Sequence, residues 1–108
     1  MTFTDYQHEP RATAVYPFGC AVMYYTLGLC GESGEVAEKV KKVIRDNDGV
    51  FDELAMCSIK AELGDVLWYL TQLATELGLS LEDIASSNLQ KLRDRQSRNA
   101  LSGSGDRR

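Results

Sequence analysis

Two pairs of acidic residues stand at a spacing that suits joint chemistry. Glu32 and Glu35 occur in the stretch GLCGESGEVAEKVKK, and Glu62 and Asp65 repeat the same spacing in ELGDVLWYL. On a helix each residue turns the side chain by about 100°, so residues i and i+3 share a face one turn apart and can contact one ligand. Carboxylates arranged in this way can hold a divalent cation or transfer a proton.

Each pair also has an ordinary interpretation. Glu is a good helix former and pairs readily with Lys one turn away, so either pair taken alone is typical of a solvated helix face. The second pair fits that interpretation less well, because apolar residues occupy most sides of its helix. These neighbours are Leu63, Val66, Leu67, Trp68 and Leu70. An unpaired carboxylate on such a helix is costly to desolvate unless a cation accompanies it.

If the two helices are neighbours, the four carboxylates could form one cluster. Like charges at that density repel one another, and a divalent cation compensates them. Ligation by oxygen alone suits Mg²⁺, with Mn²⁺ as an alternative, better than Zn²⁺, which favours His or Cys ligands. The only histidine, His8, lies far from both pairs in the sequence. The residues therefore allow a magnesium site, and solvated helix faces remain the alternative.

Composition limits the class of protein. The 108 residues predict one domain, and 44% hydrophobic with 26% charged residues is typical of a packed globular protein. The net charge of −4 argues against a nucleic-acid binder, because phosphate neutralisation requires a basic surface. No apolar run approaches the roughly 20 residues of a membrane span, and MTFTDYQHEP does not resemble a signal peptide. We therefore expect a cytoplasmic protein without nucleic-acid or membrane partners.

The three cysteines are odd in number and lack CxxC spacing, which argues against a disulfide framework or a zinc ribbon. We expect Cys20, Cys30 and Cys57 to be reduced, buried thiols.

The distribution of helix breakers predicts an all-α fold. Both prolines, Pro10 and Pro17, lie in the first twenty residues, and the rest of the chain is free to form long helices. Short connections favour antiparallel packing, so we expect a compact four-helix bundle whose two long central helices carry the acidic pairs. The first predicted helix runs from Thr4 to about Ala14, with Thr4 or Asp5 as its N-cap. The two long helices are predicted from about Met23 to Arg45 and from about Asp52 to Leu77. The fourth runs from the cap Ser80 to about Arg98, and a loop-like tail follows over 99–108.

At the acidic pairs the sequence resembles the MazG-like family of all-α nucleoside triphosphate pyrophosphohydrolases. That family is marked by the pattern EExxE, a gap, and then ExxD, which read GESGE and ELGD here. One departure is Gly31, which replaces the leading Glu, as it does in the short variant GLxGExGEvxEKvKK of small family members. The similarity also covers YQ near the start, YxxLGL, KKVIRD, NLQKLRDRQSR and GSGDRR, and so spans nearly the full length.

The resemblance implies that Glu32, Glu35, Glu62 and Asp65 are magnesium ligands. It further implies attack of water on the α-phosphorus of a nucleoside triphosphate, giving the monophosphate and pyrophosphate. Glu35, or Glu38 one turn further on, is the candidate general base through a bound water. The implied role is house-cleaning of the nucleotide pool, and the implied assembly is a homodimer or a homotetramer.

Several further residues are candidates for substrate binding. Lys39 and Lys42 lie on the same face of the helix as Glu35, four and seven residues further on. Ion pairs with Glu35 and Glu38 on a solvated surface are an equally good interpretation. On the fourth helix, Asn88 and Lys91 lie on one face with Arg95 and Arg98. This face could equally be a solvated basic surface. An aromatic side chain could stack on a base, but aromatics at helical spacing, Trp68 above all, usually belong to the core. The candidates are Lys39, Lys42, Asn88, Lys91 and Tyr69.

Two alternative functions remain. One is a non-catalytic, metal- or nucleotide-binding oligomeric helical module, which Gly31 favours. The other is a pyrophosphohydrolase of phosphoribosyl nucleotides, a relative with the same use of metal.

Overall fold

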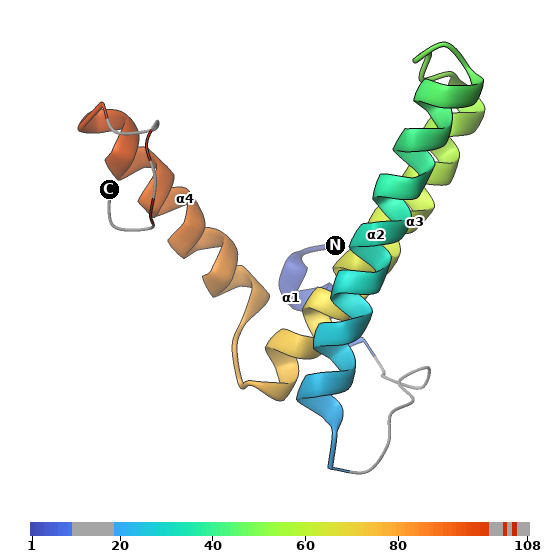
Figure 1. Ribbon diagram of the computed structural model, residues 1–108. Coiled ribbons are helices and arrows are strands. Elements are labelled where there is room, and N and C mark those ends of the chain that lie inside the picture. The colour runs from blue at the N-terminus through green and yellow to red at the C-terminus, as the bar shows by residue number, and fades with distance from the viewer. Residues whose placement is uncertain (10–18, 100–102, 104, 106–108) are drawn as a thin grey trace. The chain divides into compact units, whose positions relative to one another are not determined.

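The computed structural model describes residues 1–9, 19–99, 103 and 105. Over these residues the chain is all-helical, as predicted, with four helices and no strand (Figure 1). The helices form two units, one containing α2 and α3 and the other α1 and α4. The packing of all four into one compact bundle stays a prediction. The helices are α1 (Phe3–His8), α2 (Ala21–Asp46), α3 (Glu53–Glu76) and α4 (Leu81–Ser97).

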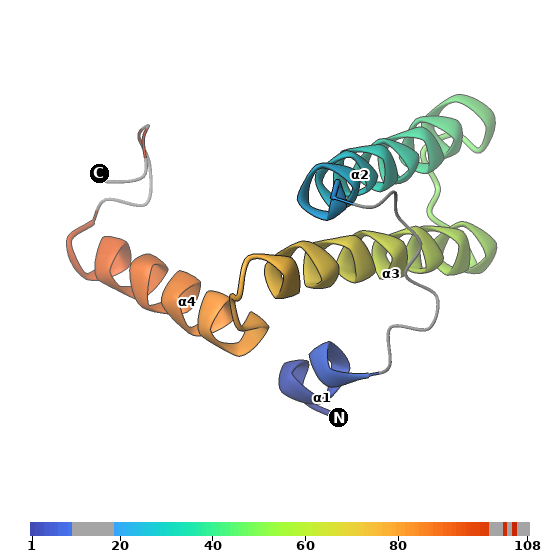
Figure 2. The ribbon, with the colours of Figure 1, turned by 90° about the horizontal axis from the view of Figure 1, so that it is seen from below.

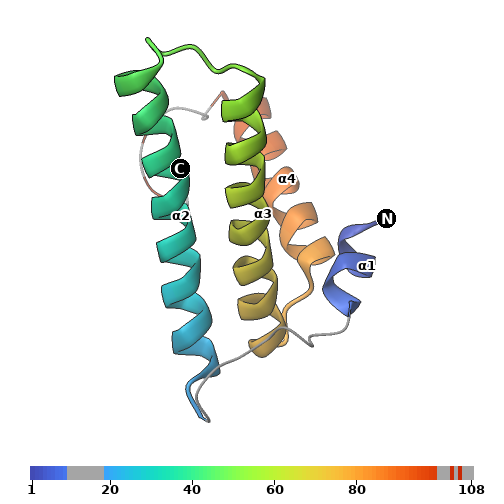
Figure 3. The ribbon, with the colours of Figure 1, turned by 90° about the vertical axis from the view of Figure 1, so that its right-hand side faces the viewer.

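The two long helices α2 and α3 form an antiparallel hairpin and lie side by side along their length (Figures 2 and 3). The predicted turn in RDNDG connects them. Asp48 and Gly49 adopt positive φ angles of 53° and 72°, and the Asn47 side chain donates a hydrogen bond of 2.6 Å to the carbonyl of Val50. Asp52 then caps α3 by accepting a hydrogen bond of 2.9 Å from the Ala55 N–H. The predicted ends of both helices are correct to within two residues.

The hairpin has a narrow core of apolar and aromatic side chains. Tyr25 is completely buried, and Thr71 and Ala74 of α3 are buried as well. α3 is less covered than its apolar composition predicts, because α2 is the one long helix that packs against it in this unit: Leu63 and Leu70 remain 52% and 37% exposed.

The second unit joins the short helix α1 to α4. The Gln7 side chain donates a hydrogen bond of 2.8 Å to the carbonyl of Leu79 and accepts one of 2.9 Å from the N–H of Leu81. Gln7 thereby satisfies backbone groups at the start of α4, where orphan N–H groups are expected. Ser80 is the N-cap of α4, as predicted, and accepts from the Asp83 N–H.

The predicted N-cap of α1 is wrong. Thr2, not Thr4 or Asp5, caps the helix, because Thr2 and Asp5 form a reciprocal capping box of side-chain and backbone hydrogen bonds. The helix also ends before the predicted Ala14, at His8. Glu9 takes the extended conformation (ψ 146°) that a following proline imposes. The remainder of the predicted helix lies outside the described residues.

The prediction of buried thiols is also wrong. Cys20, Cys30 and Cys57 are all free and exposed. Cys20 stands at the N-cap position of α2, and the other two lie at exposed positions of α2 and α3. Among the described helices, none is both long and apolar enough to cross a membrane.

Candidate metal centre

Three carboxylates meet at the middle of the α2–α3 hairpin. Glu32 comes from α2, and Glu62 and Asp65 come from α3. Each offers one oxygen, and the three oxygens all lie within 4.8 Å of one another. Glu32 and Glu62 are half-buried, whereas Asp65 is exposed. We call these residues the carboxylate cluster.

The cluster follows from helix geometry and antiparallel packing. The spacing of Glu62 and Asp65 places both on one face of α3, and this face turns toward α2, because Gln72 further along it is buried. Desolvation is the main cause that raises the pKa of Glu32 above its ordinary value, followed by the charges of Asp65 and Glu62. Burial and the neighbouring carboxylates therefore both disfavour the charged form of Glu32.

Glu35, the fourth predicted ligand, lies outside the carboxylate cluster and is exposed. It is nevertheless close, because its charge contributes to the raised pKa of Glu32. The structure thus brings three of the four predicted ligands together and leaves Glu35 beside them.

Lys39 borders the cluster. Its Nζ atom lies 3.9 Å from Oε1 of Glu62, so its ion-pair partner is on the opposite helix and not on its own. Lys39 and Lys42 also line the same hollow of about 430 Å³ between the ends of α2 and α3 nearest the turn. The two lysines thus face one hollow, and their role in substrate binding stays a prediction. Asp46 and Asp52 line it as well, so its charge is mixed.

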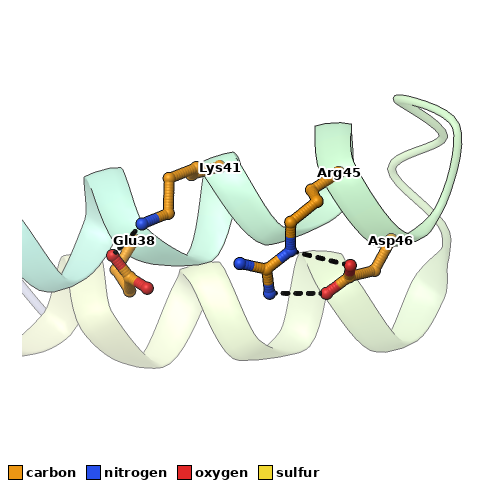
Figure 4. Close-up of polar contacts among 4 residues, drawn as sticks. All are labelled: Glu38, Lys41, Arg45 and Asp46. Carbon is orange, nitrogen blue, oxygen red and sulfur yellow. Dashed lines mark hydrogen bonds and ion pairs between the residues drawn. The ribbon is translucent and has the colours of Figure 1, made fainter.

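Glu38 is held away from the cluster. It forms an ion pair of 3.0 Å with Lys41 one turn further on, and Arg45 binds Asp46 with two hydrogen bonds on the same helix (Figure 4). The hydrogen bond with Lys41 is the main cause that lowers the pKa of Glu38. A carboxylate with a lowered pKa is a weaker base, which makes Glu38 a less suitable candidate for the general base.

Tyr69 closes the end of the cluster away from the turn. It lies one turn beyond Asp65 on α3, and its ring packs on Gly28, one turn before Glu32 on α2. Burial is the main cause that raises its pKa, and a hydrogen bond with Tyr24 and the charges of Glu32 and Asp65 add to the effect. The phenol therefore stays protonated and can donate a hydrogen bond.

Trp68, predicted to be core, is half-buried and packs edge-on against Tyr25 and Tyr69, with ring centroids at 6.0 and 5.1 Å.

Two further candidates lie together in the other unit. Asn88 and Lys91 line a hollow of about 450 Å³ beside the start of α4, as their shared stripe predicts. The stripe is not a uniformly solvated face, because Arg95 is only 5% exposed. Arg98 is exposed and pairs with Asp94 at 2.9 Å.

Sequence reasoning missed the role of Gly28. The signal was present, since Gly28 precedes Glu32 by four residues and Tyr69 follows Asp65 by four. In an antiparallel pair these equal displacements place the two residues opposite each other.

The model of the MazG nucleotide pyrophosphohydrolase domain matches residues 22–99, which include the whole carboxylate cluster. The chain belongs to the MazG family. A relative with the name Gene 37 protein, from Mycobacterium phage L5, is 45% identical over 109 residues, which cover 95% of this chain and 96% of the relative. No solved structure matches the chain. The MazG match covers all of α3 and α4 and all of α2 except its first residue.

The departure from the MazG pattern at Gly31 leaves the described cluster intact. Gly31 is exposed, and a Cβ atom there would have no neighbour within 4 Å. Because adjacent helix positions point about 100° apart, a side chain at Gly31 would not share the direction of Glu32.

Proposed function

We propose that this member of the MazG family is a magnesium-dependent nucleoside triphosphate pyrophosphohydrolase, which converts a nucleoside or deoxynucleoside triphosphate into the monophosphate and pyrophosphate. The observation that carries the proposal is the meeting of Glu32, Glu62 and Asp65 oxygens within 4.8 Å in a chain of this family. House-cleaning of the cytoplasmic nucleotide pool is the proposed biological role.

The donor set fits magnesium. Glu32, Glu62 and Asp65 would hold Mg²⁺, or Mn²⁺ in its place, through hard oxygen ligands. Desolvation, followed by the charges of Asp65 and Glu62, raises the pKa of Glu32, and a bound cation would favour its charged form. Glu35 is the proposed fourth ligand. A divalent metal supplies charge neutralisation to the phosphate oxygens.

The side chains around the cluster have distinct proposed tasks. Glu35 is exposed next to it and is the proposed general base for the attacking water. Glu38 is the weaker alternative, because Lys41 lowers its pKa. Lys39 presents positive charge to the phosphates beside Glu62, and Lys42 extends that charge along the same hollow.

The remaining substrate contacts are proposed as follows. Tyr69 is half-buried beside the cluster and keeps its proton, so its hydroxyl oxygen can accept a hydrogen bond from the substrate, or its ring can contact the base. Asn88 and Lys91 are proposed contacts from α4, and their shared hollow supports a common ligand. The substrate's base and sugar are left open by these residues.

We further propose a homodimer or homotetramer as the working assembly. Large apolar side chains are exposed on both helices of the hairpin, including Leu27 (67%) on α2 and Leu54 (82%) on α3. Covering such side chains in an interface stabilises an assembly. Light scattering after size-exclusion chromatography measures the mass directly, and a monomer at micromolar concentration would reject this part.

One experiment tests the reaction. The protein is incubated with each common ribonucleoside and deoxyribonucleoside triphosphate and Mg²⁺, and the products are separated by ion exchange. We expect equimolar monophosphate and pyrophosphate, lost in Glu35→Gln and Asp65→Asn and retained in the control Lys60→Gln, which lies on an exposed part of α3. Absence of pyrophosphate from every nucleotide would favour the non-catalytic module. The same incubation is repeated with phosphoribosyl nucleotides, and hydrolysis of these alone would favour the second alternative.

A further inference from the structure

Among the glycines within the described helices, Gly28 is the one at which a side chain would clash with a neighbouring residue. A Cβ atom built at Gly28 would overlap three atoms of the Tyr69 ring. The other described glycines of the two helices, Gly31, Gly34 and Gly64, have no atom within 4 Å of the same position. The close approach of α2 and α3 at this level therefore depends on Gly28.

The Tyr69 ring cannot simply move aside. Trp68 packs edge-on against it at 5.1 Å between ring centroids, and Tyr25 and Tyr24 lie at 6.4 Å each. Tyr25 is fully buried, and the Tyr69 hydroxyl is hydrogen-bonded to Tyr24. A ring held by three aromatic neighbours transmits a displacement to the backbone of α3, because packed interiors have little free volume.

The contact lies next to the carboxylate cluster. Gly28 is one turn before Glu32 on α2, and Tyr69 is one turn after Asp65 on α3 (Figure 3 shows the two helices side by side). The separation of the helices at Gly28 thus determines how far the Glu32 oxygen lies from the oxygens of Glu62 and Asp65. In the observed structure all three oxygens lie within 4.8 Å of one another. An added methyl group would widen that distance or push the ring toward the carboxylates.

We propose that Gly28 is a positioning residue of the metal centre: by seating the Tyr69 ring, it sets the spacing at which Glu32, Glu62 and Asp65 can bind one divalent cation. The proposal rests on the proposed metal centre. Metal ligands must lie within a few tenths of an ångström of their preferred distances, so a small change in helix separation lowers affinity steeply.

The test measures Mn²⁺ affinity of the full chain by electron paramagnetic resonance, together with the emission of Trp68, the only tryptophan. We expect Gly28→Ala to weaken Mn²⁺ binding at least tenfold and to change the Trp68 emission. The matched control, Gly34→Ala, makes the same substitution on the same helix, at a position with open space around it. It should leave the Mn²⁺ affinity and the Trp68 emission unchanged.

A variant without the Tyr69 ring distinguishes an effect of Gly28 on ligand spacing from a general loss of folding. If Gly28 acts through Tyr69, the double variant Gly28→Ala/Tyr69→Ala should bind Mn²⁺ within about twofold of Tyr69→Ala alone, because the clash is absent in both. This comparison decides the question even if Gly28→Ala does not fold.

The outcomes separate the two proposals. Mn²⁺ binding by the unchanged protein with equal affinity in Gly28→Ala would overturn this inference and leave the proposed function standing. A tenfold loss that persists in the double variant relative to Tyr69→Ala would overturn it too. No Mn²⁺ binding by the unchanged protein would reject the metal centre itself.

Discussion

Lys39 on α2 reaches across the hairpin to Glu62 on α3, with its Nζ atom 3.9 Å from Oε1. The side chains are 35% and 18% exposed, so solvent screens the pair only in part. A cation at the edge of three carboxylates reduces their repulsion, and the same charge is available to an approaching phosphate. This one contact therefore places a positive group beside the proposed metal centre.

Replacing Lys39 should affect metal and nucleotide in opposite directions. Lys39→Gln removes a cation that competes with the metal for Glu62, so Mn²⁺ affinity should rise by about 2- to 5-fold, the range of a partly exposed ion pair. The KM for the nucleoside triphosphate should increase, because a phosphate contact is lost. Metal titration and steady-state kinetics measure the two effects. The control is Lys41→Gln, whose charge is paired with Glu38; weaker binding of both ligands in Lys39→Gln would contradict the assignment.

Mg²⁺ should stabilise the folded chain. A ligand that binds only the native state adds about 2.7 kcal/mol at a concentration of 100 times its Kd, and thermal unfolding detects this as a higher midpoint. Glu32→Gln and Asp65→Asn should lose most of the increase, because each removes a negative charge from the cluster and replaces a carboxylate oxygen by an amide nitrogen. Glu38→Gln makes the same chemical change outside the cluster and should keep it. A loss in Glu38→Gln equal to that in Glu32→Gln would make Glu38 a ligand.

In the absence of metal, the two glutamates should give opposite pH dependence of stability. The pKa of Glu32 is raised in the folded chain, so its contribution is fully present below the ordinary glutamate pKa of 4.5 and is lost as pH rises through the folded pKa. The pKa of Glu38 is lowered, so its contribution is present at neutral pH and is lost as pH falls through the folded pKa. Urea midpoints in EDTA from about pH 3 to about pH 8 measure both. Glu32→Gln should raise the stability at neutral pH, whereas Glu38→Gln should not.

Two helical glycines offer stabilising substitutions. Gly34→Ala and Gly64→Ala should each raise the free energy of unfolding by about 0.5–1 kcal/mol, because Ala restricts the unfolded chain and has a higher helix propensity. Both positions lie inside helices with open space around the missing Cβ. Chemical denaturation measures the change, and Gly28→Ala is the contrasting variant, which should lower stability. Destabilisation by Gly34→Ala would show that its surroundings are occupied.

The amide of Gln7 should anchor α1 to α4. Gln7→Ala removes two hydrogen bonds, to Leu79 and from Leu81, each worth about 0.5–1.5 kcal/mol. Hydrogen exchange of the Leu81 amide should accelerate, while amides in the middle of α2 serve as the internal control. Gln7→Glu keeps an acceptor for Leu81 but cannot donate to Leu79, so its effect should be intermediate. Unchanged exchange at Leu81 in Gln7→Ala would contradict the anchor.

The helices and most of their ends were predictable because their signals are local. Asp52 and Ser80 were recognisable as the start of α3 and α4 from side-chain chemistry within three residues. The start of α1 was missed because Thr2, Thr4 and Asp5 compete for the same role, and only the observed reciprocal bonds of Thr2 and Asp5 decide it.

The candidate site was predictable in part. The spacing of Glu62 and Asp65 alone places them on one face of α3, and the family pattern pairs them with Glu32. The exclusion of Glu35 from the cluster and the pairing of Lys39 with Glu62 depend on the rotation of α2 against α3. Spacing along one helix does not contain that rotation.

By itself, the sequence determined an all-α chain of the MazG family with two acidic pairs, because helix periodicity, capping and motif spacing are properties of neighbouring residues. Only the tertiary structure decided which carboxylates meet, that Glu38 is bound by Lys41, and that Gly28 admits the Tyr69 ring. Those outcomes depend on how closely, and at what rotation, one helix packs on another, and that packing is determined by side chains far apart in the chain.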